Sequence, residues 1–268
     1  MEIQRAESSR SPLLSYDVEA VSAELQSLLS ESEQGREHQF FLDIIQRQGG
    51  LALELGSGTG QRLLPYLLAG VHVHGVEASP ELFSIYQARA QKLGLLPTVH
   101  RQTLDRLDIP MLFKTIYAPT EIFQHIDCVE TAELVLQKLF EHLELNGLLM
   151  ITLEVPSLQK LAQPQGMWQF VASAERSHDK ARIVLSQAST HSFVDQRRVI
   201  LQRYDVLHVG GRIESHLKEL ALRWYYKHEF KIMLERAGFA EISTLGDFSM
   251  NIAADGHTAW VFLATKKR

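Results

Sequence analysis

Leu51-Ala-Leu-Glu-Leu-Gly-Ser-Gly-Thr-Gly60 is the stretch of sequence that decides the fold. Its first five residues are rich in apolar side chains and predict a strand, and residues 61–68 have the pattern of a helix. Three glycines at alternate positions between these two elements allow the backbone to turn sharply and a ligand to approach it closely. The first N–H groups of the helix would then point at this ligand.

The spacing of the glycines separates this loop from two other nucleotide-binding motifs. A dinucleotide-binding loop would need its third glycine where Gln61 stands, and a P-loop would need a lysine that the chain lacks here. The stretch instead resembles the first motif of class I S-adenosylmethionine-dependent methyltransferases, Glu/Asp-x-Gly-x-Gly-x-Gly, with Glu54 in the acidic position. An ordinary strand–turn–helix corner in an unrelated α/β protein is the alternative.

A second acidic residue strengthens the resemblance. Residues 71–76 alternate apolar and polar side chains, as a strand does, and lead to Glu77. An acid at the end of the second strand of a βαβ unit can accept hydrogen bonds from both ribose hydroxyls of a nucleotide. The alternative is a solvated charge at a strand end. Ser79 and Pro80 then predict the start of the next helix.

The resemblance implies S-adenosyl-L-methionine as the cofactor and names residues that would bind it. Glu54 would position the methionine part, and a tyrosine near the start of an N-terminal helical segment, here Tyr16, would cover the cofactor. The family commonly has Gly-Asp after the third strand, whereas this chain has Gln-Thr, so the adenine would contact backbone there, with Asp105 as a substitute acid. The expected cofactor-binding residues are Tyr16, Glu54, Gly56, Ser57, Gly58, Gly60, Glu77, Ala78, Thr103, Leu104 and Ala118.

The catalytic candidates lie in Ala118-Pro-Thr-Glu-Ile-Phe-Gln-His125, which follows the predicted fourth strand. Open α/β sheets bind ligands beyond the carboxyl ends of their strands, so this segment should face the reaction site. Methyl transfer is an in-line displacement that depends mainly on alignment, with a base where one is needed. His125 and Glu121 are the candidates for handling the proton. The alternative role of His125 is to cap or orient the following helix.

The order of elements and the resemblance predict an α/β fold. We expect a doubly wound, Rossmann-like sheet of seven mostly parallel strands, in which the final hairpin reverses one strand. Three antiparallel strands, at residues 191–193, 198–208 and 212–222, are predicted to form an inserted lid, and Asn146-Gly147 is predicted as a turn before the fifth strand. The expected divisions are an N-terminal helical cap at 1–50, the cofactor-binding core at 51–155, the lid at 156–222 and the rest of the core at 223–268.

Composition narrows the class of protein. The 268 residues are 45% apolar and 22% charged, as in ordinary globular proteins, and contain neither a signal-peptide core nor an 18-residue apolar run. The single cysteine, Cys128, fits a reducing compartment, so we expect a cytoplasmic protein. The net charge of −5 argues against a nucleic-acid substrate. His72 and His74 share a strand, but without a third ligand nearby no metal site is expected.

The sequence thus predicts methyl transfer to the nitrogen or oxygen of a small-molecule acceptor. Cytosine C5 methylation is excluded because Cys128 lies outside the required proline–cysteine context. Residues 118–121 do not match the Asn/Asp-Pro-Pro-Tyr/Phe motif used for amide and exocyclic nitrogens. A protein or RNA methyltransferase and a non-catalytic cofactor-binding subunit remain as alternatives, and a homodimer is left open.

Overall fold

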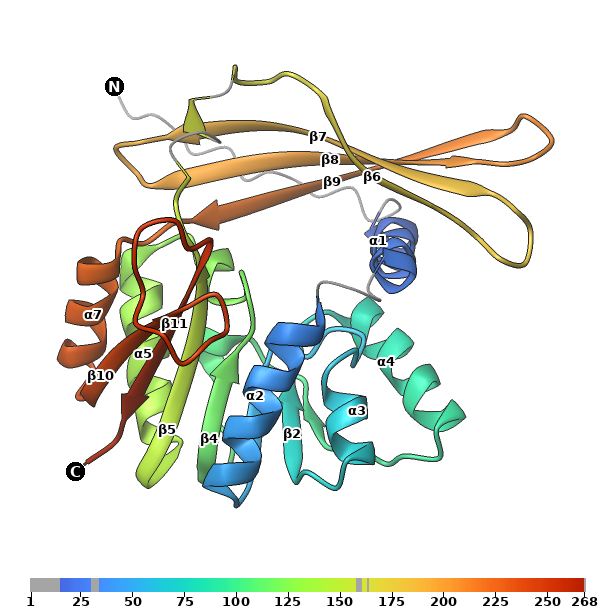
Figure 1. Ribbon diagram of the computed structural model, residues 1–268. Coiled ribbons are helices and arrows are strands. Elements are labelled where there is room, and N and C mark those ends of the chain that lie inside the picture. The colour runs from blue at the N-terminus through green and yellow to red at the C-terminus, as the bar shows by residue number, and fades with distance from the viewer. Residues whose placement is uncertain (1–14, 30–33, 158–160, 163, 268) are drawn as a thin grey trace, which may run out of the picture.

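The computed structural model describes residues 15–29, 34–157, 161–162 and 164–267 of the chain. Two sheets organise these residues: a central sheet with helices on both faces, and an antiparallel sheet that covers the carboxyl edge of the central one (Figure 1). None of the described helices is both long and apolar enough to cross a bilayer.

The central sheet has seven strands in the order β3-β2-β1-β4-β5-β11-β10. The strands from β3 to β5 pair in parallel, and β11 is antiparallel to both of its neighbours. This arrangement confirms the predicted fold class, including the reversed strand of the final hairpin. The strands are β1 Ala52–Leu55, β2 Val73–Val76, β3 Val99–His100, β4 Phe113–Ala118, β5 Leu143–Glu154, β10 Ala240–Gly246 and β11 Ala259–Thr265.

Helices bury the two faces of this sheet in two apolar clusters. Alternate strand residues point to opposite faces, so Leu53 and Ile116 pack with α5 and α7, while Ala52 and Tyr117 pack with α2, α3 and α4. The N-cap of α4 is Ser79, whose Oγ accepts the Leu82 N–H at 3.1 Å, as predicted. The helices are α2 Gln34–Gln48, α3 Leu63–Leu68, α4 Pro80–Lys92, α5 Val129–Glu141 and α7 Lys227–Arg236, with 3-10 turns η1 Leu104–Arg106 and η2 Phe123–His125.

The antiparallel sheet, which we call the lid, is inserted between β5 and α7 and has four strands. These are β6 Gln169–Glu175, β7 Arg182–Ser192, β8 Arg197–Leu207 and β9 Ile213–Arg223, hydrogen-bonded in chain order. The prediction of three strands was wrong, because β6 is largely exposed and the central part of β7, Ser186-Gln187-Ala188-Ser189, lacks a clear alternation of apolar and polar residues. Gly210-Gly211 forms the hairpin turn between β8 and β9, where the Gly211 N–H donates to the His208 carbonyl at 2.9 Å.

The helix α1 (Ser15–Leu29) packs beneath the lid rather than on the central sheet (Figure 1). Val18, Val21 and Leu25 form an apolar cluster with residues of β7 and β8, among them Ile183 and Tyr204. The Ser22 and Tyr204 hydroxyls lie 2.9 Å apart in a buried hydrogen bond. Since this cluster joins α1 to the lid, the two elements cover the carboxyl edge of the central sheet together.

The prediction of a turn at Asn146-Gly147 was also wrong, because both residues lie inside β5. Asn146 has a φ of 60°, and the pairing of β5 with β4 shifts register between Phe113 and Thr115. Its N–H donates to the Lys266 carbonyl at 2.8 Å, and the Lys266 N–H returns a bond to Gly147. Hydrogen bonds at the end of the neighbouring antiparallel strand thus hold the irregularity as a bulge within the sheet.

Candidate active site

Two adjoining cavities lie between the carboxyl edge of the central sheet and the lid. The first, of about 390 Å³, is lined by the glycine loop, and the second, of about 790 Å³, by residues that follow β2 and β3. Seven residues line both cavities, so these residues mark the junction between them: Glu19, Gly56, Glu77, Leu82, Ile122, His125 and Lys218.

Glu77 holds the glycine loop in place. Its Oε2 accepts the Gly58 N–H at 2.7 Å, and its Oε1 accepts the Ser79 N–H at 2.8 Å. Burial raises the pKa of this carboxyl, and the two backbone N–H groups oppose the increase. Gly58 has a φ of 53°, and a Cβ built there would meet no atom closer than 3.9 Å, so the loop opens onto the first cavity. Each carboxylate oxygen of Glu77 keeps a lone pair for a ligand hydroxyl.

Glu54 lies on β1 at the wall of the first cavity, and it is 1% exposed. Burial raises the pKa of its carboxyl to about 8, and the positive charge of Arg62 acts in the opposite direction. Its Oε2 has no hydrogen-bond partner among the described residues. A buried carboxylate oxygen without a partner is costly, so this atom favours a cationic hydrogen-bond donor in the cavity.

Three buried tyrosines, Tyr66, Tyr86 and Tyr117, lie around Glu54. The cation near Glu54 is Arg62. Burial raises the pKa of each phenol, and the charge of Glu54 raises it further. These hydroxyls therefore stay protonated and supply no charge. Tyr86 also packs against Gly60, whose φ of 77° and lack of a side chain allow the contact.

An ion pair links the glycine loop to the turn after β4. Arg62 Nη2 lies 2.6 Å from Glu37 Oε2 on α2. The other oxygen of Glu37 accepts both the N–H and the hydroxyl of Thr120, each at 2.8 Å. This network was not predicted from the sequence, although Arg62, two residues after the last glycine of the motif, was a signal for it.

We call residues 119–125 the catalytic turn, after the two catalytic candidates that it carries, Glu121 and His125. Glu121 has a φ of 68°, a conformation that costs a residue with a side chain about 1–3 kcal/mol, and it lines the first cavity. Its carbonyl accepts the N–H groups of Gln124 at 2.8 Å and of His125 at 3.3 Å. The backbone of the turn is thus strained at Glu121, and a hydrogen bond joins the Glu121 carbonyl to the N–H of His125.

His125 ends the catalytic turn at the junction of the cavities. Burial lowers the pKa of its imidazole, Lys218 lowers it further, and Glu19 opposes these effects. The ring is therefore neutral at neutral pH. Cys128 occupies the N-cap position of α5, and no described hydrogen bond joins the His125 ring to that helix, which weakens the capping alternative.

Lys218 on β9 and Glu19 on α1 form an ion pair of 2.7 Å beside His125. Both side chains line both cavities, so the lid and α1 meet over the junction. Sequence reasoning missed this pair because its members lie 199 positions apart and neither belongs to a motif.

The remaining predicted residues divide into three groups. Ser57 lines the first cavity, whereas Ala78, Thr103, Leu104 and Asp105 line the second. Neither Gly60 nor Ala118 is among the described residues that line the cavities, and Ala118 is fully buried in the core cluster. The side chain of Tyr16 falls outside the part of the structure that is described.

The chain is similar to known proteins in both sequence and structure. Residues 52–147 match the family model described as a methyltransferase domain. No curated protein matches the chain. A S-adenosylmethionine-dependent methyltransferase from Clostridium acetobutylicum superimposes with a TM-score of 0.76 at 15% identity, over 94% of this chain and 99% of that one.

Two further solved structures carry names that describe their acceptors. The sugar N-methyltransferase KedS8 from Streptoalloteichus has a TM-score of 0.72 at 15% identity, covering 100% of this chain and 99% of its own. CalS10, an amino pentose methyltransferase from Micromonospora echinaspora, has a TM-score of 0.68 at 17% identity, covering 96% of this chain and 100% of its own. At these identities the similarity establishes the fold.

The chain has the class I methyltransferase fold, with the methyltransferase domain at residues 52–147. This match and this fold agree with the expectation of a class I S-adenosylmethionine-dependent methyltransferase that the glycine motif and Glu77 raised.

Proposed function

We propose that the protein is an S-adenosylmethionine-dependent methyltransferase that acts on the amino nitrogen of a small, sugar-like acceptor. The observation that carries the proposal is the closure of the cavity junction by α1 and β9, where Glu19 and Lys218 pair beside His125. A covered junction suits a small acceptor better than a segment of protein or RNA. The names of the similar sugar N-methyltransferase and amino pentose methyltransferase support the choice of a sugar and of nitrogen.

The residues of the two cavities fit S-adenosylmethionine. Glu54 would bind the ammonium of the methionine part, which would give its buried Oε2 the partner that it lacks among the described residues. Glu77 would accept the ribose hydroxyls beside its two backbone contacts, and the backbone at Thr103 and Leu104 would contact the adenine. When bound, the cofactor supplies an electrophilic methyl group on its sulfonium.

Two side chains of the catalytic turn would prepare the acceptor. An amino group is largely protonated near neutral pH and must lose a proton before its lone pair can attack. His125 is neutral and exposed to the junction, so it can accept this proton. Glu121, on the wall of the first cavity, would attract the acceptor ammonium. General-base assistance of this kind accelerates reactions by about 10²–10⁴-fold.

A matched panel of acceptors tests the proposal. Methyl-labelled S-adenosylmethionine would be incubated with small amino sugars, each paired with the sugar that carries a hydroxyl in place of the amino group. We expect label in amino sugars and none in their hydroxyl counterparts. Label only in hydroxyl sugars would contradict nitrogen as the acceptor atom. Binding of S-adenosylhomocysteine without transfer to any sugar, protein or RNA would favour the non-catalytic subunit.

A further inference from the structure

The inserted lid leaves the central sheet at Glu154, the last residue of β5, and returns to it at Arg223, the last residue of β9. One side chain contacts both points. Gln124 Oε1 accepts the Glu154 N–H at 2.7 Å, and its Nε2 donates to the Arg223 carbonyl at 3.3 Å. Because one contact needs an acceptor and the other a donor, the amide has a single suitable orientation.

Gln124 also belongs to the catalytic turn. Its side chain is 3% exposed, and its own N–H is bound to the Glu121 carbonyl. The next residue is His125, at the junction of the cavities. The same residue thus joins the two ends of the lid to the backbone that carries both catalytic candidates.

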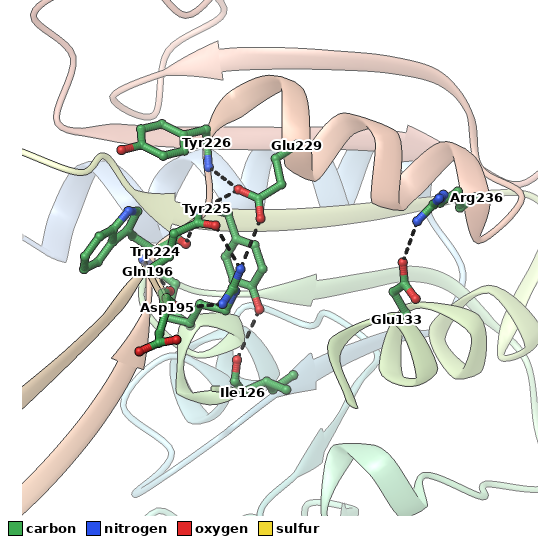
Figure 2. Close-up of polar contacts among 11 residues, drawn as sticks. Ile126, Glu133, Asp195, Gln196, Trp224, Tyr225, Tyr226, Glu229 and Arg236 are labelled. Carbon is green, nitrogen blue, oxygen red and sulfur yellow. Dashed lines mark hydrogen bonds and ion pairs between the residues drawn. The ribbon is translucent and has the colours of Figure 1, made fainter. Parts of the chain in front are cut away.

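Hydrogen bonds also hold the base of the lid, where the β7–β8 turn and the end of β9 meet the start of α7 (Figure 2). Arg223 donates to the Asp195 carbonyl at 2.7 Å and to Gln196 Oε1 at 3.0 Å. Gln196 Nε2 donates to Glu229 at 2.8 Å, and Glu229 accepts the Tyr226 N–H at 3.1 Å. These contacts connect the β7–β8 turn to the start of α7.

We propose that Gln124 is a positioning residue of the methyl-transfer reaction, which fixes His125 at the cavity junction by binding both points where the lid joins the core. The inference rests on the function proposed above. The other end of the catalytic turn is held by Glu37, through the two bonds that Thr120 donates. Loss of the Gln124 bonds therefore weakens the attachment of the turn at the His125 end, where Tyr225 Oη also donates to the Ile126 carbonyl at 3.1 Å, while Thr120 stays bound to Glu37.

Gln196 provides a matched control. Gln124→Met and Gln196→Met each remove a buried or half-buried amide at the base of the lid, but only the first touches the catalytic turn. Gln124→Glu keeps the length and an acceptor for the Glu154 N–H, and its carboxylate cannot donate to the Arg223 carbonyl. It separates the two bonds and serves in place of Gln124→Met in the turnover measurement if that variant does not fold, since its new charge would by itself raise the His125 pKa.

The decisive measurement is the titration of the His125 ring by NMR on histidine-labelled protein saturated with S-adenosylhomocysteine. The His125 signal is assigned by its loss in His125→Asn. We expect Gln124→Met to move the His125 pKa toward its ordinary value and Gln196→Met to leave it unchanged. A His125 titration in Gln124→Met equal to that of the parent would overturn the inference.

Turnover supplies the second readout. With any acceptor from the amino-sugar panel, Gln124→Met should lower kcat on the order of tenfold or more, because displacement by about 1 Å can cost 100-fold. The dissociation constant of S-adenosylhomocysteine should stay within about twofold. An equal loss of kcat in Gln196→Met would assign the effect to lid stability and contradict positioning. The NMR titration needs no acceptor, so a failure of the proposed substrate class is distinguishable from a failure of this inference.

Discussion

Replacement of Glu54 by glutamine is expected to make the ligand-free protein more stable, although it damages the cofactor site. The side chain is 1% exposed, and burial raises the pKa of its carboxyl from 4.5 to about 8. Between these two values the folded protein retains a proton that the unfolded chain releases. The burial cost is therefore absent below pH 4.5, grows as the pH rises, and is complete above pH 8.

The magnitude follows from the size of the shift. One pKa unit corresponds to about 1.36 kcal/mol, so the cost approaches about 5 kcal/mol at pH 8 and about 3 kcal/mol at pH 7, as upper bounds. Glu54→Gln has nearly the same volume and no titration. Its free energy of unfolding should exceed that of the parent by an amount that increases steadily from pH 5 to pH 8.

Urea unfolding at pH 5, 6, 7 and 8, without ligand, measures this difference directly. Glu241→Gln is the control, because Glu241 is exposed on β10 and its replacement should show no comparable trend. Glu54→Gln should at the same time lower the affinity for S-adenosylhomocysteine, since a lost hydrogen bond to a charged group costs about 1.5–3 kcal/mol. A stability difference independent of pH, or a less stable Glu54→Gln at pH 8, would refute the argument.

Three further predictions concern the cofactor and the base. S-adenosylhomocysteine should raise the melting temperature and NAD should not, because a ligand at about 100 times its dissociation constant stabilises by about 2.7 kcal/mol; a shift with NAD alone would contradict the cofactor. Glu77→Ala should weaken S-adenosylhomocysteine binding at least about tenfold in calorimetry while the circular dichroism spectrum is retained; unchanged affinity would place the ribose elsewhere. His125→Ala should lower kcat by about 10²–10⁴-fold at unchanged cofactor affinity and abolish the fall in kcat below the His125 pKa; a parent-like pH profile would exclude His125 as the base.

Short-range patterns explain what could be predicted. The glycine loop, Glu77 and the Ser79 cap are each determined by residues close together in sequence, and the structure places them as expected. The bulge at Asn146 shows the limit of this approach. Asn-Gly favours a turn in isolation, but hydrogen bonds to Lys266, far along the chain, keep it within β5. Local preference yields here to pairing with a neighbouring strand.

The residues of the site that were not predicted escaped notice for a different reason. Glu37, Gln124 and Lys218 each act through a partner brought close by the fold, so their roles depend on topology. The sequence pattern alone indicates that Glu37 is an acidic residue in the first turn of a helix and that Lys218 is a charged residue on an exposed strand. The part of the cavity wall formed by the glycine loop and Glu77 was thus predictable from motifs, whereas the part formed by the lid and α1 was not.

Under the proposed function, the charges of the first cavity would favour the sulfonium donor over its neutral product. Its walls carry the carboxyl groups of Glu54, Glu77 and Glu121. The two cations among its described lining residues, Arg62 and Lys218, already form ion pairs with Glu37 and Glu19. A cavity of this kind attracts positive charge. The sulfonium of the donor is lost on transfer, and under the proposed function the positive charge would move to the methylated nitrogen. Carboxylates that held the donor would therefore hold the neutral thioether less tightly, which would favour exchange of the spent cofactor after each turnover.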